Sequence, residues 1–129
     1  MTIDTSMLAQ FSGTDEPHQY SMLFRRTLLS DGAKYVADNG GGHGAYWLMD
    51  AIASHQIKAM KNARLREFQV WKLKVNHKSG HAVLTCQEDS DVKPAITQRI
   101  EYTDFDLDEI KLYVEFDGKY QMIMLPSEH

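Results

Sequence analysis

The second half of the chain alternates hydrophobic and polar residues with a period of two, which is the pattern of half-buried β-strands. Trp71, Leu73 and Val75 alternate with lysines in the first such segment. The same alternation predicts strands over residues 82–86, 96–102, 110–116 and 120–125. Asp117-Gly118 is typical of a two-residue hairpin turn. Such a turn would place Val114 opposite Gln121, Leu112 opposite Ile123 and Ile110 opposite Leu125.

The first half of the chain has helical spacing instead. We expect a helix over Ser21–Leu29, a second one that Asp31 caps and that ends at Asn39-Gly40, and a third one that continues to about Leu65. Helices followed by strands predict an α+β domain over 1–129, with N-terminal helices packed on one face of an antiparallel β-meander of about five strands. Residues 1–19 are expected to form a mobile or loosely attached arm that Leu8 and Phe11 could dock.

Composition excludes several classes of protein. The 129 residues carry a net charge of −4, which argues against broad affinity for nucleic acid. No apolar run approaches the roughly 20 residues of a membrane span, and the N-terminus shows no secretory signal pattern. The single cysteine, Cys86, cannot form an internal disulfide, so we expect a cytoplasmic protein with a buried, inert thiol.

The glycine run Gly40–Gly44 precedes a helix, as a phosphate-binding loop does. It lacks the lysine of a P-loop and the third glycine of a dinucleotide-binding loop. A flexible connection and an anion site are the two alternatives. A related hypothesis is a small enzyme or ligand-binding domain, in which His43, Asp50 and His55 would line a pocket at this loop.

The sequence provides no specific evidence for a metal or cofactor. His77 and His81 flank a turn, but two ligands do not make a structural zinc site, which usually has four. The run of acidic residues from Asp104 to Glu109 lacks the glycine of a calcium loop. We therefore expect no cofactor, no metal and no catalytic residue.

Tyrosine and methionine residues gather on one face of the last predicted hairpin. Tyr113, Tyr120, Met122 and Met124 make this face too apolar for ordinary exposure to solvent. Another part of the chain could cover it, or it could bind a protein partner. In the second case, the acidic run that includes Asp104, Asp106 and Asp108 would form the rim.

Charge is also segregated along the chain. Half of the 14 basic residues lie in the segment from Lys58 to Lys78. The alternatives are a solvated surface and a contact surface for a charged partner or a second copy of the chain. Weak binding of nucleic acid through residues 58–74 is a further hypothesis.

Several blocks together resemble one family. They include Gly44-Ala45-Tyr46-Trp47-Leu48-Met49-Asp50-Ala51-Ile52-Ala53-Ser54, Phe68-Gln69-Val70-Trp71-Lys72-Leu73, Tyr102-Thr103-Asp104-Phe105, Ile110-Lys111-Leu112-Tyr113-Val114 and Met124-Leu125-Pro126-Ser127-Glu128. The blocks are similar to an uncharacterised family of small bacterial, phage and plasmid proteins. The resemblance implies a mobile-element setting and carries no catalytic residues. By association it suggests a non-enzymatic accessory protein that binds a host protein and could inhibit a CRISPR-type defence complex.

Overall fold

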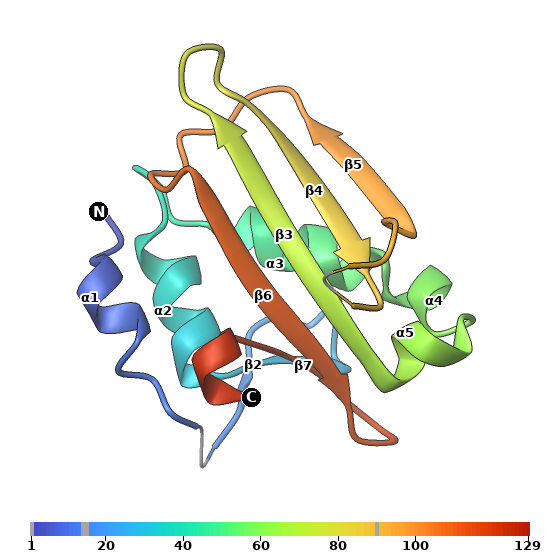
Figure 1. Cartoon of the computed structure of the whole chain (residues 1–129). Coiled ribbons are helices and arrows are strands. Elements are labelled where there is room, and N and C mark those ends of the chain that lie inside the picture. Colours follow the sequence, from blue (N-terminus) through green and yellow to red (C-terminus); the bar gives the residue numbers. More distant parts are fainter. Residues whose placement is uncertain (1, 14–15, 90) are drawn as a thin grey trace.

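The computed structural model describes residues 2–13, 16–89 and 91–129, and within these it has a seven-stranded sheet with helices on one face (Figure 1). The strands are β1 (His18–Gln19), β2 (Thr27–Leu29), β3 (Phe68–Asn76), β4 (His81–Gln87), β5 (Ile96–Ile100), β6 (Glu109–Phe116) and β7 (Gln121–Met124). Their order in the sheet is β1-β2-β7-β6-β3-β4-β5. All pairs are antiparallel except β2–β7, which is parallel.

This architecture confirms the α+β class and corrects the sheet topology. A simple meander of five strands is wrong, because β6 pairs with β3 on the side opposite β4. The predicted helix over Ser21–Leu29 is also wrong, since Thr27–Leu29 forms β2. Strand β2 pairs with β7, which lies almost 100 positions later in the chain, so local spacing could not reveal this pairing.

The helical elements are α1 (Thr5–Leu8), α2 (Asp31–Asn39), α3 (Tyr46–Ser54), α4 (Gln56–Ala59), α5 (Ala63–Glu67) and the 3₁₀ helix η1 (Pro126–Glu128). The N-cap of α2 is Ser30 rather than Asp31, because the Ser30 hydroxyl accepts the Ala33 N–H. The helix expected to continue to about Leu65 is broken after Ser54 and again before α5, where Asn62 caps the new helix. Ala59 of α4 and Leu65 of α5 are nevertheless buried in the core.

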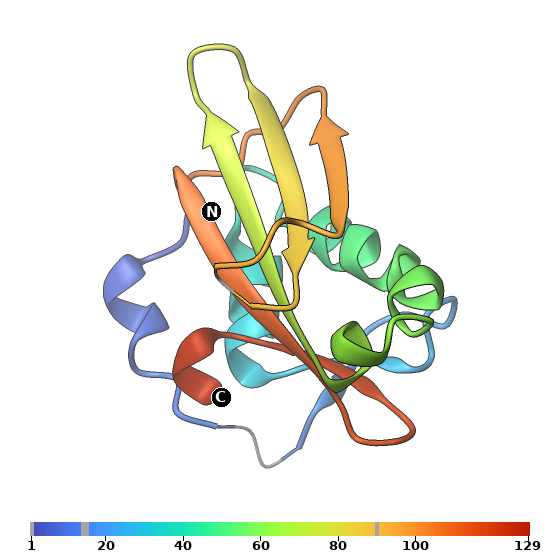
Figure 2. The same cartoon turned by 45° about the vertical axis from the view of Figure 1, so that its right-hand side comes forward.

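The core lies between the inner face of the sheet and helices α2 and α3 (Figure 2). Its centre is formed by side chains that are at most 1% exposed: Leu29, Val36, Leu48, Met49, Ile52, Trp71, Leu73, Leu84, Leu112, Val114 and Ile123. Burial of each large apolar side chain stabilises the fold by roughly 1.5–3 kcal/mol. The alternation that predicted the strands therefore marks this core correctly.

The hairpin between β6 and β7 has a longer loop than expected. Val114 pairs with Ile123, and Phe116 pairs with Gln121, so the predicted register is wrong by two residues. The Asp117 carboxylate accepts the N–H groups of Lys119 and Tyr120, which closes the turn. A shift of two keeps every side chain on its predicted face.

The N-terminal segment is fixed to the rest of the chain at several points. Ile3 is buried, and its N–H donates to the Asp106 carboxylate over 2.7 Å. Leu8 and Phe11 pack against the core, as expected, and the Phe11 ring lies 5.5 Å from that of Tyr35.

Candidate functional site

A tight turn before β2 exposes two large apolar side chains. The Ser21 hydroxyl accepts the N–H groups of Leu23 and Phe24, so its side chain satisfies two backbone donors of the turn. Met22 is 73% exposed and Leu23 is 81% exposed. These local hydrogen bonds therefore fix the turn in a conformation that exposes Met22 and Leu23 to solvent.

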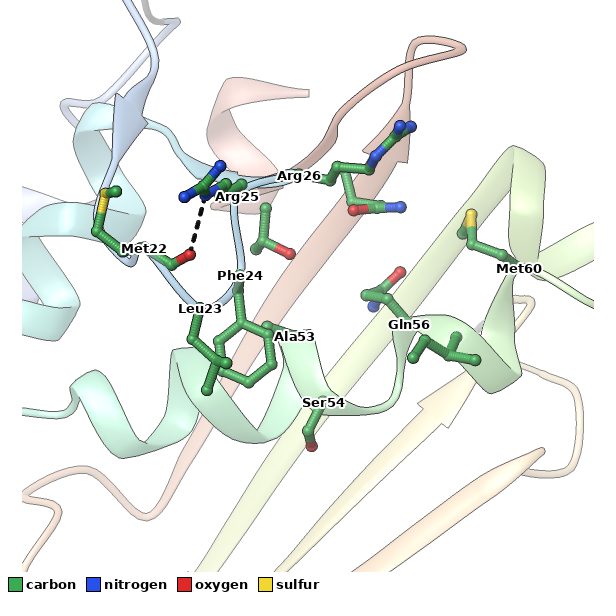
Figure 3. Close-up of a pocket in the computed structure, with 12 residues that line it drawn as sticks. Met22, Leu23, Phe24, Arg25, Arg26, Ala53, Ser54, Gln56 and Met60 are labelled. Atoms are coloured by element: carbon green, nitrogen blue, oxygen red, sulfur yellow. Dashed lines mark hydrogen bonds between the residues drawn. The ribbon is translucent and has the colours of Figure 1, made fainter.

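The break between α3 and α4 supplies the opposite wall. Gln56 is buried at the first position of α4, which leaves the next residue, Ile57, 78% exposed. Figure 3 shows Leu23 and Phe24 pointing from the turn toward Ala53 and Ser54 of α3.

Together these elements form an apolar groove of about 720 Å³, called the 22–60 groove below. Its lining residues are Met22, Leu23, Phe24, Arg25, Arg26, Thr27, Ala53, Ser54, Gln56, Ile57, Met60 and Gln121. Its volume is in the range of ordinary ligand-binding clefts, roughly 300–1,000 Å³.

Both charged residues that line the groove are cations. Arg25 and Arg26 are exposed at its rim, and the Arg25 guanidinium donates to the Met22 carbonyl (Figure 3). Methionine and arginine are enriched in protein interfaces, and methionine adapts its shape to a partner. The chemistry of the lining therefore suits a partner with apolar and acidic side chains.

A buried amide network fixes the base of the groove. The side chains of Gln56 and Gln69 bond reciprocally, each amide donating to the other over 2.9 Å. The Gln69 oxygen also accepts the Trp71 indole N–H over 2.7 Å. This network joins the start of α4 to β3, so the position of Ile57 depends on the core.

The glycine run binds carboxylates of its own chain. The Gly41 N–H donates to Asp106, and the Gly42 N–H donates to Asp104, over 3.0 and 2.8 Å. The predicted rim residues Asp104 and Asp106 thus cap this loop, while Asp108 lies 3.0 Å from His77. Two of the N–H groups that could bind an external phosphate therefore already donate to carboxylates of the chain.

The three residues of the predicted pocket have different partners. The Asp50 carboxylate accepts a hydrogen bond from the Tyr20 hydroxyl. The His55 ring forms a hydrogen bond with the Gln98 side chain and stacks on Trp71. His43 is exposed in the glycine loop. No bond between these three side chains is present in the part of the chain that the structure describes.

The predicted Tyr/Met face lies largely against its own chain. Met124 is 2% exposed. Tyr113 contacts Phe68 and His129, with ring centroids 4.9 and 5.4 Å away. Tyr120 and Met122 are half-buried at the other end of the hairpin. Other parts of the chain therefore cover Tyr113 and Met124, which is the first of the two alternatives for this face.

Three side chains have strongly shifted pKa values, and none suits a nucleophile or base. Burial raises the pKa of the Cys86 thiol to about 12. Burial and then the bond to Asp38 raise the pKa of Tyr46 to about 12, and burial and the Asp50 charge raise that of Tyr20 further. In the described residues, no three His, Cys, Asp or Glu side chains are placed to hold a metal ion.

Comparison with known proteins places the chain in a family. A family model described as a family of unknown function, DUF6876, matches residues 2–129. The chain belongs to the DUF6876 family. It matches no curated protein and no solved structure.

The groove of this DUF6876 chain was not predicted from its sequence. The helical spacing places Met22, Leu23 and Ile57 in two predicted helices, where an apolar residue is expected to face the core. Ser21 gives no contrary signal, because a serine at the first position of a predicted helix is equally typical of an N-cap. None of the helices in the described residues of this family member is long and apolar enough to cross a membrane.

Proposed function

We propose that this protein is a non-enzymatic binding protein and that the 22–60 groove receives a segment of a protein partner. The observation that carries the proposal is the exposure of Leu23 and Ile57, about four-fifths each, on opposite walls of one groove. Scattered apolar side chains are common on surfaces, but a contiguous apolar patch with a polar rim is typical of an interaction site.

The partner segment is amphipathic, with apolar side chains toward Leu23, Phe24 and Ile57 and acidic side chains toward the rim. Arg25 and Arg26 provide the charge complementarity, since no carboxylate lines the groove among the described residues. Arginine binds carboxylates in a bidentate manner, so these two residues would fix the register of the segment.

A non-enzymatic role agrees with the lining of the groove. Its hydroxyl groups come from Ser54 and Thr27, and Ser54 donates its proton to the Ala51 carbonyl over 2.7 Å. No histidine, cysteine or carboxylate lines the groove in the described part of the chain, so no general base stands beside these hydroxyls.

The mobile-element setting, and a CRISPR-type defence complex as the partner, are hypotheses that rest on the sequence resemblance. The groove supports only the wider proposal of protein binding. The groove is the surface at which that hypothesis can be tested, because an inhibitor must contact a large complex through a defined patch.

Site-directed photo-crosslinking tests the proposal. A benzoyl-phenylalanine replaces Ile57 in one sample and Tyr102, which is 75% exposed, in a matched control. In lysate of cells that naturally carry the gene, we expect a crosslink to a protein of different mass from position 57, absent from position 102 and suppressed by Leu23→Ser. A crosslink to a second copy would make the groove a dimer contact. Equal labelling from both positions, or none, would contradict the proposal.

A further inference from the structure

The outer face of the sheet, opposite the helices, carries a cluster of cations that we call the basic face: Lys72, Lys74, Arg99 and Lys111. The strand register places all four on one side. Lys72 pairs with Lys111, Lys74 pairs with Val83 and with Glu109, the carboxylate on this face that Lys72 also approaches, and Val83 in turn pairs with Arg99. Their inward neighbours Trp71, Leu73 and Leu112 are buried, so the lysines point outward. The cluster spans four adjacent strands, from β6 to β5.

Two of these cations oppose each other directly. Lys72 on β3 and Lys111 on β6 are cross-strand partners, and like charges in this position destabilise a sheet. Lys72 is within 3.9 Å of Glu109, while Lys74, Arg99 and Lys111 form no ion pair with any described residue. The chain as a whole has a charge of −4, so the cluster is not a consequence of composition.

The basic face is also hollowed. A concavity of about 220 Å³ lies between Lys72 and Lys74 of β3, Val83 and Thr85 of β4, and Pro94 of the following loop. Beside it, a second concavity of about 360 Å³ extends along the same two strands toward Asn76 and His81. In Figure 2 no helix covers this part of the sheet, and the loop after β4 folds over its lower end.

We propose that the basic face binds an extended acidic segment of a protein. Lys72 and Lys74 are two positions apart on one strand, a spacing of roughly 6.6 Å, which equals that of alternate carboxylates on an extended peptide. Thr85 and Thr97 continue the row from Lys72 and add hydroxyl donors. This site is on the opposite side of the sheet from the 22–60 groove, so it stands independently of the function proposed above.

A protein segment fits this surface better than a nucleic acid does. Sheets that bind single strands use outward aromatic side chains on which bases stack. Here Tyr113, which lies two positions after Lys111 on β6 and on the same face, packs against Phe68 and His129.

The test is an NMR titration of the ¹⁵N-labelled full chain with an octaglutamate peptide, with oligothymidylate of equal charge and with inorganic phosphate. We expect octaglutamate to shift the amide signals of β3 and β4 around Lys72 and Thr85, with weaker binding as salt rises. Lys111→Gln should lower the affinity at least fivefold without lowering the melting temperature, since it removes a like-charge pair. Lys58→Gln combined with Lys61→Gln, both exposed on or just after α4, is the matched control and should change affinity less than twofold.

Three outcomes would overturn the proposal. Tighter binding of the oligonucleotide than of octaglutamate would assign the face to nucleic acid. Saturation by phosphate with the same shifts at lower concentration would assign it to a small anion. Equal loss of octaglutamate affinity in Lys111→Gln and in the Lys58 and Lys61 control would show that only net charge matters.

Discussion

At the residue scale, two N–H groups of the glycine run donate to carboxylates from residues more than 60 positions later. Gly41 binds Asp106 and Gly42 binds Asp104, and Asp106 also accepts the Ile3 N–H. One pair of aspartates therefore fixes both the loop before α3 and the N-terminal segment. An acidic run that suggested a contact rim from the sequence has a structural role at two of its positions.

Replacing Gly44 by alanine should destabilise the protein more than the same change at Gly118. Both glycines have positive φ, +81° and +100°, which strains any other residue. A Cβ at Gly44 would also lie 2.7 Å from the Ala37 carbonyl oxygen. A Cβ at Gly118 would have no surrounding atom within 4 Å. We expect a loss of about 2–3 kcal/mol for Gly44→Ala and about 1 kcal/mol for Gly118→Ala in urea unfolding. Equal losses would show that the loop can move away from Ala37.

The stability of the protein should fall as the pH rises through the range in which Tyr46 ionises. The pKa of Tyr46 rises to about 12 in the fold, against about 10 in an unfolded chain. The folded state holds this proton more tightly, so the stabilisation is complete below pH 10 and is lost as the pH rises toward 12. Absorbance at 295 nm should show tyrosines that titrate late in native protein and near pH 10 in urea. Tyr46→Phe should remove one late step; titration of every tyrosine near pH 10 in native protein would contradict this.

At the element scale, the sequence predicts strands better than helices here. The alternation at Trp71, Leu73 and Val75 reports burial on one face directly, so β3 to β7 were located to within a few residues. The segment from Ser21 to Leu29 failed because its structure depends on β7, and no local pattern encodes that pairing. The register of the last hairpin failed because the Asp117 side chain closes a longer loop.

The groove was missed for a related reason. Its walls come from one mispredicted helix and from the break between α3 and α4. The break depends on Gln56, which turns inward to meet Gln69 on β3. A polar side chain in a helix is normally expected to face solvent, so the helical pattern does not indicate this inward turn and predicts a helix that continues to about Leu65.

Gln69→Leu should destabilise the protein by about 2–4 kcal/mol. It leaves the Trp71 indole N–H and the Gln56 amide oxygen without their buried partner, and each unsatisfied polar group costs about 1–3 kcal/mol. The matched test is the double variant Gln56→Leu and Gln69→Leu. Its loss in urea unfolding should be smaller than the sum of the single losses, because it removes both members of the amide pair. Additive losses would show that the two amides do not act as a unit.

At the scale of the whole molecule, the sheet separates two surfaces of different chemistry. The helical side carries the apolar 22–60 groove with an arginine rim, and the opposite side carries the basic face. The Tyr/Met face that the sequence suggested as a contact is partly covered by His129 and Phe68. The basic segment 58–74 is divided between the two sides. Lys58 is in α4, which contributes Ile57 to the groove, and Lys72 lies on the basic face.

The central claim is that the 22–60 groove binds a protein, and the affinity of groove variants for the crosslinked partner tests it most directly. The variant is Leu23→Ser combined with Ile57→Ser, and Tyr102→Ser is the control. All three side chains are at least 75% exposed, so the melting temperatures should change little. We expect the groove variant to lose about 100-fold or more in affinity, as for two interface hot spots, and the control to stay within about twofold. A folded groove variant that binds as tightly as the unaltered protein would contradict the account.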